Sequence, residues 1–434
     1  MIWNEKHETM APAKMEALQE ERLVKIVKYT YENVPFYNKL LREHKISPED
    51  IKSKADIGKL PFITKQNMRE NYPCGMLAVP VNKLSRFHTS SGTTGRPTAV
   101  AYTANDLEVW SEVLARSLSA GGLCQDSVFQ VTVKYGLFTG GLGMHSAAEK
   151  VGATIIPSST GNTARQIMLM KDFGTTHFIA TPSYALFLRE TMDTEGISID
   201  ELNIQSVFCG AEAWSDDMRR ELENQYKVKT YDIYGLSEII GPGVSWDCSE
   251  QNGLHIQEDH FYLEVIDPDT GEVLPEGAEG ELVITTLTKE AMPMIRYRTR
   301  DLTRLYREKC PCGRTTLKMR RVMARSDDML IIRGVNMFPS QIESVLLGMN
   351  ILAPHYQLVV DRVNNLDVLT VKVEMTEELF LESQTRLLKL EADIRNRLKD
   401  IIGVKALVKL VEPKSIERSE GKAHRVIDNR LKNT

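Results

Sequence analysis

The sequence predicts an α/β protein: a large N-terminal α/β domain with a parallel sheet and a strand-rich subdomain, plus a small α+β C-terminal domain. Between about residues 105 and 235, helical stretches alternate with short apolar runs, and such alternation implies a mostly parallel sheet. After about residue 245 the pattern changes to strands and turns, which indicates an antiparallel subdomain. A polar run at residues 324–328 marks a second boundary. We expect domains at residues 1–326, with the strand-rich part at about 245–325, and at 327–434.

Length and charge set limits on the kind of protein. A chain of 434 residues exceeds what one hydrophobic core usually supports. The net charge of −5 gives no electrostatic footprint for nucleic acid or for an anionic membrane. The first residues are polar and mixed in charge, and no run of about 18 apolar residues occurs. We expect a cytoplasmic protein with neither partner, and a homodimer is a possible assembly.

The individual elements follow from periodicity and turn residues. Residues 13–32 carry apolar side chains at helical spacing, which predicts an amphipathic helix. Residues 84–88 and 98–103 read as two strands of a hairpin. The expected parallel strands are 128–133, 153–156, 177–180, 206–209 and 229–231, and the expected antiparallel ones are 261–266, 281–286 and 294–306. The C-terminal domain is expected to contain strands at 329–332, 356–360, 368–375 and 405–411, and helices at 340–348 and about 383–401.

The hairpin tip, Thr89 to Thr98, is rich in glycine and small hydroxyls, which is typical of a phosphate-binding loop. A Walker A loop needs Gly, four residues and then Gly-Lys-Ser/Thr. Here Gly92 and Gly95 are only two residues apart and Arg96-Pro97 follows, so that spacing fails. The alternative is a flexible turn. The candidate nucleotide-binding residues are Ser90, Ser91, Gly92, Thr93, Thr94 and Gly95.

This loop resembles the glycine-rich motif of adenylate-forming acyl-CoA ligases, and Thr98 in place of a common Lys is similar to the phenylacetate-CoA ligase branch. Residues 234–238 match the aromatic-Gly-x-Ser/Thr-Glu motif of the same family. The resemblance implies that Tyr234 stacks on adenine, that Gly235 and Ser237 line the nucleotide site, and that Glu238 is a catalytic residue that binds Mg²⁺. The alternative is a strand-to-helix turn with an N-capping serine.

Two further motifs are assigned to the nucleotide by the same resemblance. Residues 210–214 are similar to a Gly-Ala-Glu segment that lines the adenine and acyl pockets, which implicates Ala211 and Glu212. Residues 296–302 resemble a Tyr-x-Thr-x-Asp motif whose Asp, here Asp301, accepts hydrogen bonds from the ribose hydroxyls. An arginine-rich edge strand is the alternative there. Asp232 either contacts the adenine amine or caps a turn.

Residues 325–343 resemble the hinge and the start of a mobile C-terminal domain, with ATP bound between the two domains. By the resemblance Arg325 reaches the ribose or a phosphate, and Asp327 is the hinge. Residues 419–425 resemble the tail that carries a catalytic lysine, here Lys422, which bridges the acyl carboxylate and the α-phosphate. The alternative is an ordinary charged C-terminus. Thr93 is a third catalytic candidate beside Lys422 and Glu238.

Residues 134–143 follow a predicted strand and combine aromatic residues with four glycines. Aromatic faces pack flat substrates and small residues leave room for a ring. We therefore expect Tyr135, Phe138, Gly140 and Gly235 to line an aryl pocket.

Three of the six cysteines bracket the strand-rich subdomain with one histidine. Cys248, His255, Cys310 and Cys312 make up a Cys₃His set, the ligand count of structural zinc. The Cys-x-Cys spacing is tighter than the usual Cys-x₂-Cys, so free thiols are the alternative, and His260 or Asp247 are substitute ligands.

Together the motifs predict an ATP-dependent ligase that activates an aryl carboxylic acid, most readily phenylacetate or a close arylacetate, through an acyl-adenylate and transfers it to CoA. The expected cofactors and cosubstrates are ATP, Mg²⁺ and CoA, with a structural zinc. One alternative is an adenylyltransferase of the deazaflavin-adenylating type, without CoA transfer. The other is an ATP-binding regulator with a degenerate site, against which Glu238, Asp301 and Lys422 all speak.

Overall fold

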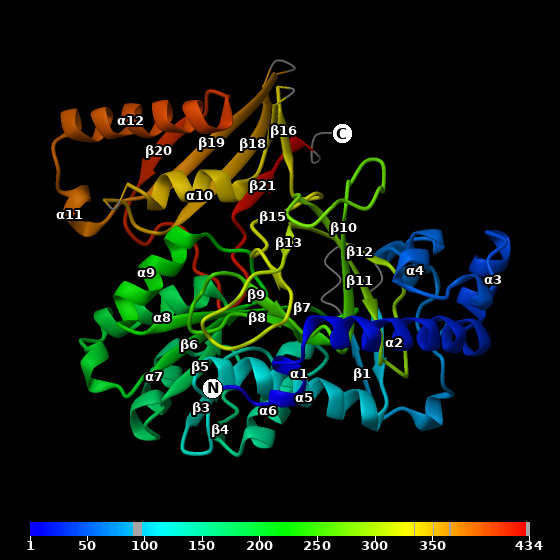
Figure 1. The fold of residues 1–434 in the computed structure, drawn as a ribbon. Coiled ribbons are helices and arrows are strands. Elements are labelled where there is room, and N and C mark those ends of the chain that lie inside the picture. Colours follow the sequence, from blue (N-terminus) through cyan, green and yellow to red (C-terminus); the bar gives the residue numbers. More distant parts are fainter. Residues whose placement is uncertain (90–97, 334, 350, 364–365, 431–434) are drawn as a thin grey trace. The chain divides into compact units, whose positions relative to one another are not determined.

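The computed structural model describes residues 1–89, 98–333, 335–349, 351–363 and 366–430 (Figure 1). It divides into two compact units. Unit 1 comprises Met1–Ala180, Gly196–Ala211 and Val228–Arg321, and unit 2 comprises Thr181–Glu195, Glu212–Lys227 and Val322–Thr434. Unit 2 therefore takes in two stretches that precede residue 228, each carrying one helix.

The longest helix of unit 1 is the predicted amphipathic helix, which is confirmed as α2 (Pro12–Asn33). Its buried residues recur at helical spacing, among them Met15, Leu23 and Val27. A proline at its first turn and an extended Val34 at its end set its length. The other helices are α1 (Glu5–Glu8), α3 (Pro35–Glu43), α4 (Lys65–Glu70), α5 (Ala104–Ala120), α6 (Thr139–Val151) and α7 (Thr163–Asp172). Short 3₁₀ turns lie at Pro48–Asp50, Lys54–Lys59, Val81–Lys83 and Ile199–Glu201.

Among the described residues, nine strands form the large sheet of unit 1 in the order β13-β14-β9-β8-β7-β6-β5-β3-β4. The strands from β4 to β7 run parallel, as predicted, and the others pair antiparallel, so the sheet is mixed. The parallel strands are β3 (Val128–Val131), β4 (Thr154–Ile156), β5 (His177–Ala180), β6 (Ser206–Gly210) and β7 (Lys229–Leu236). The antiparallel ones are β8 (Gly241–Trp246), β9 (Leu254–Ile256), β13 (Leu305–Tyr306) and β14 (Lys318–Met319).

The predicted hairpin strands are confirmed as β1 (Arg86–Thr89) and β2 (Ala99–Tyr102), which pair antiparallel with Thr89 opposite Ala99. The loop that joins them lies outside the described residues, and with it the six candidate nucleotide-binding residues from Ser90 to Gly95.

A second, antiparallel sheet of unit 1 contains β10 (Phe261–Ile266), β11 (Gly280–Thr286) and β12 (Tyr297–Thr303). The first two match the predicted strands. The expected strand at 294–306 is instead two elements, β12 and β13, and the first begins at Tyr297, directly after Arg296, whose φ is 48°. Within β12, Arg300 also has a positive φ, of 69°, and the pairing of β11 with β12 shifts register between Glu281 and Val283.

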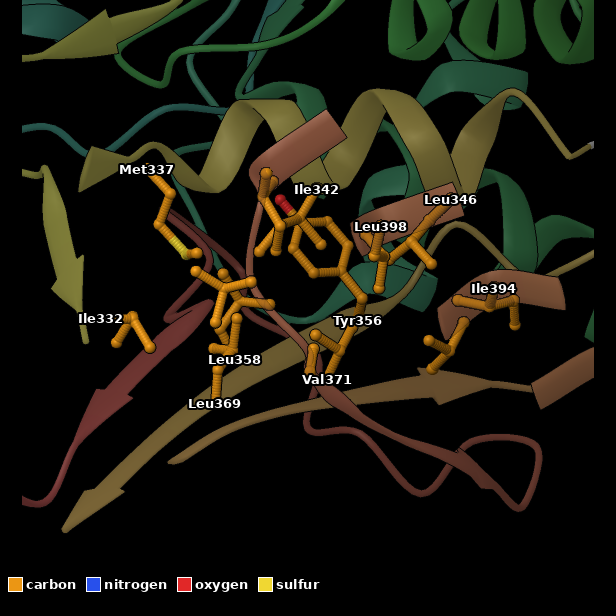
Figure 2. Close-up of a cluster of buried hydrophobic side chains, with 14 of the residues drawn as sticks. Ile332, Met337, Ile342, Leu346, Tyr356, Leu358, Leu369, Val371, Ile394 and Leu398 are labelled. Atoms are coloured by element: carbon orange, nitrogen blue, oxygen red, sulfur yellow. The ribbon is translucent and has the colours of Figure 1, made fainter. Parts of the chain in front are cut away.

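The C-terminal part of unit 2 packs two helices on one face of a small sheet. Its strands lie in the order β20-β19-β18-β21. A separate hairpin of β16 and β17 precedes these strands in the sequence. Figure 2 shows Ile342 and Leu346 of α10, and Ile394 and Leu398 of α12, pointing toward the apolar side chains of β18 and β19. The elements are β15 (Ala324–Arg325), β16 (Leu330–Ile332), β17 (Val335–Met337), α10 (Pro339–Leu347), β18 (Tyr356–Val363), β19 (Leu366–Glu374), α11 (Glu377–Phe380), α12 (Gln384–Ile402), β20 (Leu407–Val411) and β21 (Val426–Asp428).

Two helices from these earlier stretches complete unit 2: α8 (Pro182–Thr194) and α9 (Asp216–Tyr226). Strand β21 pairs parallel with β18 inside the charged tail, where three residues leave no periodic signal to predict it. Across the ranges described, no helix combines the length and the apolar character needed to cross a membrane.

Candidate active site

Two motifs that are far apart in the sequence meet through one hydrogen bond. The Tyr234 hydroxyl, near the end of β7, donates to Asp301 Oδ2 of β12 at 2.6 Å. The backbone N–H of Asp301 donates to Thr299 Oγ1 at 3.0 Å. Asp301 is buried, so its carboxylate is held in a defined position. An aromatic ring beside a fixed carboxylate is suited to an adenine and its ribose hydroxyls.

The end of β7 is shaped by Gly235. A Cβ at this position would lie 2.1 Å from the carbonyl oxygen of Gly241 and 2.7 Å from the Cα of Pro242, so only glycine permits β8 to approach so closely. The motif therefore runs along a strand end into a turn and a second strand, and the strand-to-helix alternative is wrong. At the turn, Ser237 Oγ lies 2.9 Å from Thr139 Oγ1 at the start of α6.

Glu238 is buried in this turn and carries an ion pair on its carboxylate. Its Oε1 lies 3.0 Å from Nζ of Lys65, the first residue of α4, whose side chain is 46% exposed. A carboxylate that already attracts a cation has the charge to bind a hard metal ion as well. Sequence reasoning missed Lys65 as a site residue, because it lies outside the motifs described above.

A second lysine lies on the other side of the same turn. Lys289 Nζ donates to the carbonyl oxygens of Ile239 at 2.5 Å and Glu238 at 3.3 Å. Burial lowers the pKa of Lys289 to about 8, while the charges of Asp106 and Glu238 act in the opposite direction. No sequence pattern pointed to Lys289, because a single lysine in a loop carries no periodic signal.

The predicted aryl-pocket residues lie around the start of α6. Phe138 is its N-cap residue and Gly140 is buried in its first turn. The Tyr135 hydroxyl lies 3.1 Å from His145 Nδ1, and burial, with a smaller contribution from Glu149, raises the pKa of Tyr135. Tyr135 therefore stays a neutral phenol at physiological pH.

The three residues predicted to lie near the adenine are Ala211, Glu212 and Asp232, and each has its own local environment. Ala211 follows β6 with a φ of 66°. In unit 2, Glu212 accepts a hydrogen bond from Ser183 Oγ at 2.7 Å and lies 3.9 Å from Arg425 Nε. Asp232 is buried on β7, and its N–H donates to an Asp247 carboxylate oxygen at 2.9 Å.

The predicted hinge and tail residues belong to unit 2. Arg325 Nε lies 2.9 Å from Asp327 Oδ1, and both side chains are exposed. Lys422 is exposed, and its carbonyl accepts from Ser419 Oγ at 2.9 Å. The next carbonyl toward the N-terminus, that of Gly421, accepts from Thr181 Oγ1 at 2.9 Å. Two hydrogen bonds thus hold the backbone at Gly421 and Lys422.

The structure brings the four predicted zinc ligands together in unit 1. One ligand atom from each of Cys248, His255, Cys310 and Cys312 lies within 4.8 Å of all the others. His255 Nδ1 bonds Thr316 Oγ1 at 2.9 Å, which leaves Nε2 for the cluster, where it lies 3.4 Å from Cys312 Sγ. Such a partner on the second ring nitrogen is usual for metal-binding histidines.

The substitute ligands have other partners, and cations surround the cluster. His260 Nδ1 lies 2.8 Å from Thr288 Oγ1, and the Asp247 carboxylate accepts from the Asp232 N–H. Arg314, two residues after Cys312, donates to Glu8 Oε2 at 2.6 Å. Against the effect of burial, Glu308 and Cys310 raise the pKa of Lys318, whose side chain is wholly buried. The thiol of Cys248, with His255, holds the pKa of Cys312 well below its usual range.

Comparison with known proteins gives full-length similarity. Residues 9–288 match the family model described as AMP-binding enzyme, and residues 334–430 match that of the AMP-binding enzyme C-terminal domain. The chain is 48% identical to a phenylacetate-coenzyme A ligase of Thermus thermophilus, covering 99% of this chain and 100% of the relative. The Escherichia coli protein of the same name is 46% identical, covering 98% and 97%. A solved 2-hydroxyisobutyryl-CoA ligase with 2-HIB-AMP superposes with a TM-score of 0.94 at 29% identity, covering 99% and 93%.

Proposed function

This chain belongs to the AMP-binding enzyme family, as a phenylacetate-CoA ligase-like member, and from that premise we propose that its substrate is an arylacetic acid, with phenylacetate the first candidate. ATP-dependent ligation to CoA through an acyl-adenylate is the activity that its relatives support. The observation that carries the substrate proposal is the identity of 45–49% with four phenylacetate-CoA ligases over nearly the whole chain.

The reaction proceeds in two steps. First, a carboxylate oxygen of the acid attacks the α-phosphorus of ATP, and the bond to the departing pyrophosphate breaks. Then the sulfur of CoA, having lost its proton, attacks the acyl carbonyl, and the bond to AMP breaks. The proposed residue roles are those that the family resemblance implies, and charge and shape agree with them: Tyr234 and Asp301 hold the adenosine, and Lys422 offsets negative charge at the α-phosphate. Mg²⁺ bound at Glu238 would neutralise phosphate charge.

The acid itself is proposed to bind beside α6. Tyr135 and Phe138 supply aromatic faces. A Cβ at Gly140 would lie 3.0 Å from the Phe138 ring, so this glycine lets the ring pack against the start of α6, whereas Gly235 is packed against the Gly241 carbonyl of β8. A neutral phenol and small residues favour a flat, largely apolar group over a charged one. These features support an acid that carries an aryl ring, as an arylacetic acid does.

The substrate proposal is tested with a panel of phenylacetate, hydroxyphenylacetate, indoleacetate, benzoate and fatty acids, scored by CoA-dependent AMP release. We expect phenylacetate or a close arylacetate to give the highest kcat/KM. Preference for a fatty acid or for benzoate would contradict it. AMP transfer that needs no thiol would instead favour a deazaflavin-adenylating type, which none of the named relatives supports. Absence of pyrophosphate exchange with every acid would favour an ATP-binding regulator.

The proposed role of Lys422 predicts a separation of the two steps. Lys422→Ala should abolish pyrophosphate exchange, because the α-phosphate loses its positive charge, yet it should spare thioester formation from supplied acyl-adenylate. The two steps are measured separately, with Lys414→Ala as a control for an exposed lysine elsewhere in unit 2. An equal loss in both steps would contradict the role.

We also propose that the Cys₃His cluster holds a structural zinc. Three thiolates with Zn²⁺ carry one net negative charge, and the adjacent Arg314 and Lys318 offset it. Elemental analysis of purified protein should find about one zinc per chain. Cys310→Ser should lose most of it and lower the midpoint of thermal unfolding, whereas Cys74→Ser should keep it. Full-length folded protein without zinc would contradict the proposal.

A further inference from the structure

The turn that follows Glu238 is anchored by a buried cation. Lys289 is 3% exposed, and two of its three ammonium hydrogens reach the carbonyl oxygens of Glu238 and Ile239. The ring of Tyr102 faces the ammonium, with its centroid 5.0 Å away. In the part of the chain that the structure describes, no carboxylate lies within 4.0 Å of it. The charges of Asp106 and Glu238 favour the ammonium from beyond ion-pair distance, and they offset only part of the cost of burying it.

Neutral side chains hold the next part of the same turn. The Tyr102 hydroxyl donates to the Ile240 carbonyl at 3.1 Å. Trp110 stacks on the Tyr102 ring, with centroids 5.2 Å apart, and donates from Nε1 to the Pro242 carbonyl at 3.0 Å. Anchoring a turn of this kind therefore requires no charge, since Tyr102 and Trp110 accomplish it with neutral donors. The charge of Lys289 needs a different explanation.

That explanation lies in the residue whose carbonyl Lys289 holds. Glu238 is contacted by two lysines: the half-exposed Lys65 reaches its carboxylate at 3.0 Å, and the buried Lys289 reaches its backbone. An exposed ammonium can move away when a metal ion arrives, whereas a buried one that donates to two carbonyls cannot. Lys65 can therefore give up its place at Glu238 to a metal ion, whereas Lys289 stays in place.

We propose that Lys289 is a positioning residue for adenylation: its ammonium fixes the Glu238–Ile239 turn and thereby the carboxylate that binds the magnesium complex of ATP. The inference rests on the proposed function of Glu238 as a magnesium ligand. It assigns Lys289 no contact with substrate. Its effect should appear in the magnesium dependence of the first step and should be absent from the second.

The first test is Lys289→Met, which keeps the apolar stem and removes the charge. We expect the free Mg²⁺ concentration for half-maximal pyrophosphate exchange to rise about tenfold, as for loss of a partner behind a metal ligand. Thioester formation from supplied acyl-adenylate should stay within about twofold of wild type. Lys171→Met, at an exposed ion pair in the same unit, is the matched control and should change neither. Equal loss in both steps, or an unchanged magnesium dependence, would overturn the proposal.

A double-mutant cycle distinguishes the positioning role of Lys289 from the proposed role of Glu238 as a magnesium ligand. If Lys289 acts through Glu238, then Lys289→Met should have little further effect on pyrophosphate exchange in a Glu238→Gln background. Persistence of its full effect there would overturn the proposal. A Glu238→Gln enzyme with wild-type magnesium dependence would refute the magnesium role of Glu238 instead. Should Lys289→Met fail to fold, Lys289→Gln keeps a donor without the charge, and the same cycle with it decides the question.

Discussion

At the scale of single residues, burial sets the charge state of His177 in the parallel sheet. This β5 residue is 1% exposed, stacks on Phe208 with centroids 6.2 Å apart, and lies 2.8 Å from Thr176 Oγ1. Burial lowers the pKa of His177 to about 4 from its ordinary 6.5. Above pH 6.5 both folded and unfolded chains keep it neutral, whereas between pH 6.5 and 4 only the unfolded chain binds the proton. Stability therefore falls as the pH drops through this window.

The consequence is measurable as a difference between two proteins. From pH 7 to pH 5, His177 should account for about 2 kcal/mol of lost stability. His177→Gln cannot take up the proton, so its free energy of unfolding should fall by that much less over the same range. Denaturant titrations at both pH values provide the comparison. His260, whose pKa burial also lowers to about 4, stays in both proteins. Parallel loss in the two proteins would refute the assignment to His177.

At the scale of elements, one carboxylate joins three parts of unit 2. Glu343 on α10 accepts from the backbone N–H of Ser215, the N-cap of α9, at 3.1 Å, and from the Tyr356 hydroxyl of β18 at 2.9 Å. It also pairs with the guanidinium of Arg425. Helix α9 thus begins on a residue whose backbone is bonded to α10, which accounts for its membership of unit 2.

Removing this carboxylate should therefore weaken the whole unit. Glu343→Ala leaves Arg425 without that partner, and breaking such a buried pair costs about 3 kcal/mol. Denaturant unfolding, with hydrogen exchange of α9 and α10 as a local readout, measures the loss. Glu417→Ala removes an exposed carboxylate from the same unit and should change stability by less than about 0.5 kcal/mol. A similarly small change for Glu343→Ala would show that the pair contributes little.

At the scale of the whole molecule, local sequence patterns predicted the elements that depend on neighbouring residues of the chain. Apolar runs and turn residues located the parallel strands, the hairpin and most of the C-terminal domain. The antiparallel extension of the large sheet was not predicted, because β8, β9, β13 and β14 pair through contacts that no local pattern encodes. The extension of β7 through Tyr234 has the same origin, since β8 supplies its partner.

The candidate site divides in the same way. Residues within motifs, such as Tyr234 and Asp301, were proposed from the sequence, and these two are hydrogen-bonded in the structure. Lys65 and Lys289 were missed because their relevance lies in distances to Glu238 across more than fifty residues of chain in one case and far more in the other. A lysine outside any motif can be assigned to a site only when the structure shows which residues it contacts.

The Cys₃His cluster links the fold to the redox state of its surroundings. Cys248 Sγ lies 3.7 Å from Cys310 Sγ, so without a metal the two thiols need only a small shift to reach the S–S bond length of about 2.05 Å. An oxidant would then join residues 248 and 310 and consume two of the four ligands. The zinc that we propose for this cluster could then bind only after a thiol reductant had reopened the bond. Metal loss in an oxidising buffer would thus trap the subdomain in a metal-free form that added zinc alone does not reverse.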